Sequence, residues 1–274
     1  MFTEIYDSNN RQFSLYLTIK CEGKKKFRVI ADDSGKPNSQ YANRDVVVNQ
    51  EKTIYLSFPV SPKKISVEIF NVGDPNDNSF TVKATAKPLK SYNIWMDAET
   101  KDFLTLAINF AQRAGFEKAS DEGILWKTDD DKFRIKYFNV ISDIKTGRVY
   151  NTPARIGHNT GIIEVAKAKF DKYTVPMRLI ILLHEFSHKY MNPKIDREIG
   201  DEVSADINAL NIYLSLGYPY IEAQYEFLNV FRGANNELNH RRYLILNDFM
   251  KKFNNGELEN KCIVSHPINN RVRA

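Results

Sequence analysis

The chain has 274 residues, a formal net charge of +5, 42% hydrophobic residues and two cysteines. This composition excludes an intrinsically disordered protein and a small disulfide-stabilised fold, because the chain is long enough to bury a substantial core. The charge is too small to indicate a nucleic-acid partner, and no apolar run approaches the roughly 20 residues of a membrane-spanning helix. The length favours two domains, and a change of pattern divides the chain into residues 1–92 and 93–274.

The first 92 residues contain short runs in which apolar and polar residues alternate, separated by segments rich in Gly, Pro, Asp and Asn. Alternation of this kind is typical of strands with one buried face, and the pattern predicts an antiparallel β-sandwich. The expected strands lie at residues 13–19, 46–48, 53–58, 65–70 and 80–84. This part has no histidine, so we interpret it as a binding or assembly module for homo- or hetero-oligomers. Lys24–Lys26 is expected at a solvated hairpin tip rather than on a nucleic-acid surface.

After residue 95 the apolar spacing changes to the period of helices. Helices are expected at residues 98–114, from about 174 through 188, and at 199–216, 221–231 and 238–253. Strands are expected at residues 133–141 and 161–166, between the first two helices. This order predicts an α+β fold for residues 93–274.

The second of these helices carries His184-Glu185-Phe186-Ser187-His188. Positions four apart lie on one face of a helix, so His184 and His188 can bind one zinc ion while Glu185 reaches water beside it. The apolar run before His184 indicates a buried helix, which would fix the histidine rotamers.

A catalytic zinc usually has three protein ligands and keeps one position for water. The next helix carries Glu202, which we expect to be the third ligand, and Asp206 lies one turn further on. Ala205 and Ala209 are small enough to allow close approach of the two helices. We expect Asp206 to accept the free ring N–H of a metal-binding histidine, His184, and so to fix its tautomer.

The pattern HExxH followed by ExxxD on a second helix resembles that of the gluzincin metallopeptidases. The resemblance implies a compact zincin-like domain that binds Zn²⁺ and acts as a zinc-dependent endopeptidase, with Glu185 as the general base that uses a metal-activated water. It also implies a mixed sheet whose edge strand pairs with an extended peptide or protein substrate. Gly161–Ala166 is the candidate for that strand.

Gluzincins usually add a His or Tyr that donates to the tetrahedral intermediate, and no motif identifies it here. His240 is one candidate, although a surface histidine is the alternative interpretation. Four tyrosines are equally available, namely Tyr213, Tyr218, Tyr220 and Tyr225. His158 and His266 are left outside the expected site.

Two other functions stay open at this point. One is a structural or assembly protein, for example a bacteriophage virion component, built on a zincin-like domain with a retained or idle zinc site. The other is a regulator that cleaves one specific partner. The first residues are acidic and lack the apolar core of a signal peptide, and Cys21 and Cys262 lie in different expected domains. We therefore expect a cytoplasmic protein with free thiols, or a virion-associated one in the structural alternative.

Overall fold

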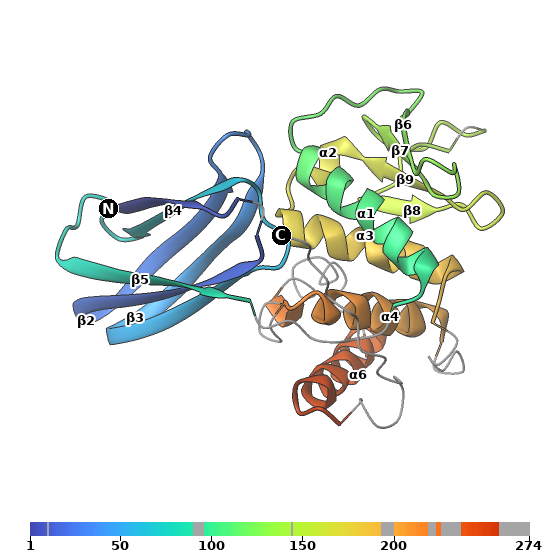
Figure 1. The fold of residues 1–274 in the computed structure, drawn as a ribbon. Coiled ribbons are helices and arrows are strands. Elements are labelled where there is room, and N and C mark those ends of the chain that lie inside the picture. The colour runs from blue at the N-terminus through green and yellow to red at the C-terminus, as the bar shows by residue number, and fades with distance from the viewer. Residues whose placement is uncertain are drawn as a thin grey trace, which may run out of the picture. The chain divides into compact units, whose positions relative to one another are not determined.

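The computed structural model describes residues 1–9, 11–89, 96–143, 145–192, 200–218, 223–225 and 237–257. Within these residues the protein is mixed α/β with two separate sheets, A and B (Figure 1). The chain divides into two compact units. The first comprises residues 1–90, 111–118 and 171–176, and the second comprises the remainder. No helix among the described residues is long and apolar enough to cross a membrane.

Sheet A is antiparallel throughout. It contains β1 (Phe2–Asp7), β2 (Phe13–Asp33), β3 (Gln40–Phe58), β4 (Lys64–Asn71) and β5 (Phe80–Pro88). The order is β1-β4-β2-β3, and β5 also pairs with β2. The antiparallel arrangement expected from the alternating runs is present. The described strands form one hydrogen-bonded sheet rather than two, and the expected runs at 46–48 and 53–58 both belong to β3.

The long strand β2 explains how a single sheet encloses a core. Residues 13–21 of β2 pair with β5 and residues 27–33 pair with β4, while β3 follows β2 along nearly its whole length. The register shifts between Lys20 and Lys24, and a bulge at this point allows the strand to bend. The rings of Phe27 of β2 and Phe80 of β5 lie 4.8 Å apart, so the start of β5 packs on the second half of β2.

The expected hairpin tip at Lys24–Lys26 is wrong, because β2 continues through these residues. Lys25 forms an ion pair with Asp77 at 2.7 Å, and Lys26 forms one with Asp45 at the same distance. The polar residues around the bulge interrupt the alternation and therefore resemble a turn in the sequence. Neighbouring carboxylates neutralise part of the lysine charge.

The second unit places four strands and the helices around another core. The strands are β6 (Ile124–Lys127), β7 (Arg134–Phe138), β8 (Ala154–Ile156) and β9 (Ile162–Ala166). The helices are α1 (Ala98–Arg113), α2 (Lys167–Phe170), α3 (Val175–Lys189), α4 (Asp201–Ser215) and α6 (Glu237–Asn254). In Figure 1, sheet B, α3, α4 and α6 follow one another from top to bottom. The expected helix at 221–231 falls almost entirely outside the described residues.

Aromatic contacts fix α1 against its neighbours in this unit. The ring of Phe103 stacks on Phe186 of α3 at 4.1 Å, and Phe110 meets Tyr137 of β7 edge-on at 5.1 Å. Phe103, Phe110, Tyr137 and Phe186 are all buried. The helix that carries the HExxH motif is therefore held by α1 on a rigid aromatic core.

Sheet B is mixed, with the order β6-β7-β9-β8. β7 and β9 are parallel, whereas the β6–β7 and β8–β9 pairs are antiparallel. β9 thus lies inside the sheet, and the expectation that residues 161–166 form the edge strand is wrong. The edge beside β9 is β8, whose three residues are too few to show a strand pattern in the sequence.

Candidate metal centre

Helix α3 is a core helix, and this sets the positions of its two histidines. Pro176 lies in the first turn, where a missing N–H costs no intrahelical hydrogen bond. Residues 179–183 form an unbroken apolar run that is at most 2% exposed. His184 follows directly and is only 6% exposed, so its ring is fixed by the surrounding packing.

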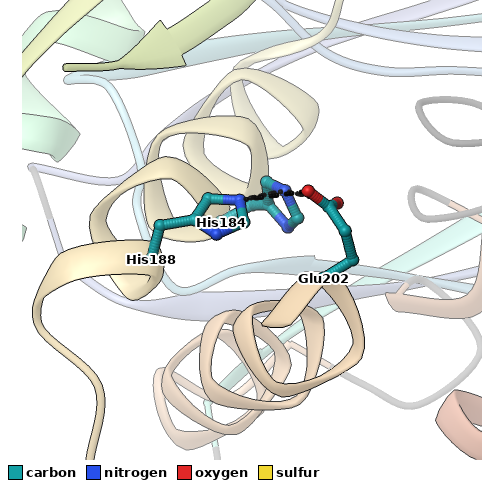
Figure 2. Close-up of side chains that lie close together, drawn as sticks. All are labelled: His184, His188 and Glu202. Atoms are coloured by element: carbon teal, nitrogen blue, oxygen red, sulfur yellow. Dashed lines mark hydrogen bonds and ion pairs between the residues drawn. The ribbon is translucent and has the colours of Figure 1, made fainter. Parts of the chain in front are cut away.

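Three side chains from two helices converge beside this run. His184 and His188 of α3 have their Nε2 atoms 3.2 Å apart. Glu202 of α4 places Oε2 3.6 Å from the His184 Nε2 and Oε1 3.6 Å from the His188 Nε2. Figure 2 shows both imidazoles turned toward the Glu202 carboxylate. Over the described ranges, these are the residues that form a group able to hold a metal ion.

The separations between these donor atoms fit a metal site. Ligands bound at 2.0–2.1 Å around a tetrahedral ion lie about 3.4 Å from one another. The two histidine nitrogens are 3.2 Å apart, and each lies 3.6 Å from a different oxygen of Glu202, so the three donor groups are spaced close to that value. Two imidazole nitrogens and one carboxylate oxygen also form a donor set that suits zinc and other divalent transition metals. The residues present therefore fit a bound metal ion.

Each histidine has a carboxylate at its other ring nitrogen. Asp206 Oδ1 lies 2.8 Å from the His184 Nδ1, and Asp206 is 1% exposed. Asp201 Oδ2 lies 3.0 Å from the His188 Nδ1, although its side chain is 67% exposed. Carboxylates in these positions keep the proton on Nδ1 and leave Nε2 for a metal. Asp206 was predicted beside His184, whereas Asp201 was not predicted from the sequence; the one signal for Asp201 is its position next to Glu202 at the start of a helix.

A guanidinium from α6 completes the polar network. Arg242 donates from Nε and Nη2 to Asp206 Oδ2 at 2.9 and 2.7 Å, and its Nη2 lies 3.3 Å from Glu202 Oε2. Arg242 was not predicted from the sequence. Its role depends on how α6 packs on α4, and no local pattern encodes that packing.

The charges around Glu202 keep it ionised. Its contact with His184 is the largest influence and lowers the pKa of Glu202 to about 2, with further contributions from His188 and Arg242. Burial opposes protonation of His184, but Asp206 and Glu202 outweigh that effect and raise the pKa of His184 well above its usual value. Glu202 is therefore in the ionised form that binds a metal, and a metal ion would take the place of the proton that these carboxylates favour on His184.

Glu185 faces the same cavity from α3. The cavity has a volume of about 490 Å³ and is lined by residues of α3, α4, α6, β8 and the segments flanking β8. Burial raises the pKa of Glu185, while His184, His188 and a backbone hydrogen bond from Ile156 act in the opposite direction. A carboxylate with a raised pKa, next to metal-binding residues, has the properties of a general base.

The other candidate residues lie elsewhere. His240 is exposed on α6 and does not line the cavity, whereas Asn239 and Arg242 of the same helix do. Tyr213 and Tyr218 are buried and stacked on each other at 4.0 Å. Neither they nor Tyr225 line the cavity. Tyr220 and His266 lie outside the described residues. His158, in the loop after β8, does line the cavity.

Comparison of the chain with protein-family models, with curated proteins and with solved structures gave no match. The function is therefore inferred from the geometry of the site.

Proposed function

We propose that the protein is a zinc-dependent endopeptidase of the gluzincin type. The observation that carries the proposal is the convergence of His184, His188 and Glu202, at separations that suit one metal ion, with Glu185 in the same cavity. A zinc ion held by these residues would polarise the scissile carbonyl and bring the pKa of water close to neutral. Three protein ligands with an adjacent carboxylate suit a catalytic zinc site, because structural zinc sites are usually closed by four protein ligands.

Glu185 acts as the general base in this mechanism. Its carboxylate takes the proton of the attacking water and then passes it to the nitrogen of the leaving amine. Burial favours the protonated form of Glu185 and so makes the first transfer, from water to the carboxylate, easier. Asp206 and Asp201 hold the two histidine rings, and Arg242 holds Asp206 and Glu202.

Strand β8 is the surface on which an extended substrate would bind. The N–H of Gly157 and the carbonyl of Pro153 bond to β9, so the N–H and carbonyl groups of Ala154 and Ile156 face the opposite edge, where the Ile156 N–H donates to Glu185. Within the described part of the chain, β8 pairs with β9 alone. A peptide that adds to this edge would pair with the backbone groups of Ala154 and with the Ile156 carbonyl, and would lie along the cavity beside Glu185. We therefore assign substrate pairing to β8 in place of residues 161–166.

The proposal is tested by replacing the general base without changing the metal-binding residues. We expect Glu185→Gln to retain zinc and to lose peptidase activity by at least about 100-fold, since a side-chain amide cannot accept the proton. Glu122→Gln, at an exposed position of the same unit, is the matched control and should remain fully active. Zinc content by elemental mass spectrometry and cleavage of an unstructured protein are measured on the same samples. Undiminished turnover in Glu185→Gln would refute the role of Glu185.

A further inference from the structure

A buried asparagine side chain on α4 hydrogen-bonds the C-terminal end of α3. Asn208 is 2% exposed, and its Nδ2 donates to Ser187 Oγ at 2.8 Å and to the Tyr190 carbonyl at 3.5 Å. The backbone N–H of Asn192 donates to its Oδ1 at 3.3 Å. One side chain of α4 thus bonds three residues at the end of α3 and just after it, on both sides of His188 in the sequence.

The partner on α3 is itself fixed. Ser187 is fully buried, and its hydroxyl donates to the Leu183 carbonyl at 2.6 Å while it accepts the bond from Asn208. Only an amide can donate to Ser187 and Tyr190 and at the same time accept from Asn192. A carboxylate would lack the donors, and an aliphatic side chain would leave the buried Ser187 hydroxyl and the two partly buried backbone groups without that partner.

The start of α4 contacts α3 through the exposed side chain of Asp201, which lies 3.0 Å from His188 Nδ1. Its N-cap is Gly200, with φ of 106°, which offers no side chain to cap the N–H groups of the first turn. Asp201 and Glu202 lie in that first turn. The position of the Glu202 carboxylate relative to the two histidines therefore also depends on contacts further along α4.

We propose that Asn208 is a positioning residue for the metal centre, setting the distance and rotation of α4 against α3. This inference rests on the metal site of the proposed function. Asn208 contacts neither the metal-binding atoms nor a substrate, and it acts through the helices that carry His188 and Glu202. A site whose bonds are only 2.0–2.1 Å long loses affinity when a ligand moves by a few tenths of an ångström.

Asn208→Ala and Asn211→Ala make a matched pair for the test. Both residues are buried asparagines of α4, 2% and 7% exposed, but the side-chain oxygen of Asn211 has no hydrogen-bond partner within the described residues. Zinc affinity is measured by competition with a chromophoric chelator, and coordination geometry by the visible absorption of the Co²⁺ form. Thermal unfolding of the metal-free proteins reports stability separately.

We expect Asn208→Ala to weaken zinc binding by about 10-fold or more and to alter the Co²⁺ spectrum, whereas Asn211→Ala keeps both. Asn208→Asp, which keeps the acceptor for Asn192 but loses the donors, should resemble Asn208→Ala. If Asn208→Ala does not fold, Ser187→Ala removes the same contact from α3 and should shift affinity and spectrum in the same direction.

Two results would overturn the inference, and they are distinguishable. Folded Asn208 and Ser187 variants with wild-type affinity and spectrum, even at a lower melting temperature, would show that the contact is only structural. A wild-type chain that binds neither Zn²⁺ nor Co²⁺ would instead refute the metal centre on which the inference rests.

Discussion

Four carboxylates lie around the candidate metal centre, although only one of them, Glu202, belongs to the group that could hold the metal. Glu185, Asp201, Glu202 and Asp206 lie within one network, and Arg242 is the cation that faces two of them. Asp206 is almost fully buried, so its charge is stable only because Arg242 and His184 lie against it. Arg242 is therefore expected to matter for folding as well as for the site.

Replacement of Arg242 by Met should destabilise the metal-free protein by about 3 kcal/mol, because a buried carboxylate loses its cation. The adjacent Arg241 is exposed, and Arg241→Met serves as the control for the loss of one positive charge from α6. Urea unfolding of both variants measures the difference in free energy of unfolding. Equal stability of the two variants would show that the contact of Arg242 with Asp206 contributes nothing to folding.

A second titratable residue, Asp32, lies in sheet A, far in sequence from the metal centre. Burial is the main cause that raises the pKa of Asp32 to about 6, and the negative charge of Glu68 adds to it. The unfolded chain has the ordinary value near 4, so the folded protein binds the proton more tightly between about pH 4 and 6. The free energy of unfolding should therefore fall as pH rises through this window.

For this partly exposed carboxyl we expect the fall to be about 1 kcal/mol. Asp32→Asn should abolish it, and Glu68→Gln should reduce it to a smaller extent. Urea unfolding at several pH values, followed by circular dichroism, measures the effect. A variant Asp32→Asn with the same pH dependence as the wild type would mean that Asp32 is not the group responsible.

At the scale of elements, the short strand β8 presents alternate backbone groups at the edge that does not pair with β9. Alternate backbone groups of β8 face β9 and the open side, so a paired substrate must also present alternate amides to β8. If a substrate pairs with β8, cleavage should depend on every second backbone amide of the substrate. Recognition of side chains alone would not produce this period of two residues.

Peptide substrates methylated at single backbone nitrogens test this period. Methylation of an amide that faces β8 should lower kcat/KM by about 10-fold, roughly the effect of one lost hydrogen bond with its partner left unsatisfied. Methylation of the next amide, which faces away, should be tolerated. Amides next to the scissile bond are excluded from the comparison, and an equal effect at every other position would argue against strand pairing.

The sequence supports predictions best where structure depends on local spacing. His184 with His188, and Glu202 with Asp206, each lie four residues apart, and the helix period alone places each pair on one face. The contacts of Arg242 with α4 and of Asn208 with α3 depend on the packing of whole helices, which one sequence does not encode locally. The interior position of β9 likewise follows from parallel pairing with β7, a long-range choice. β2 was predicted too short because a bulge interrupts its alternation.

At the scale of the whole molecule, the described residues that line the cavity all belong to the second unit. The first unit contributes none of the residues of the candidate metal group. The chemistry proposed here is thus a property of the second unit, and the role of sheet A as a binding or assembly module stays a prediction.

The central claim is that one zinc ion binds at this site and supports peptide hydrolysis. The most direct measurement is zinc content by elemental mass spectrometry on the wild-type chain and on Glu202→Ala, with digestion of casein by the same samples with and without a chelator. We predict about one zinc per wild-type chain, lost in Glu202→Ala, together with cleavage that the chelator abolishes. A wild-type chain that binds no zinc, or one that binds zinc but cleaves neither casein nor a peptide library, would contradict the account.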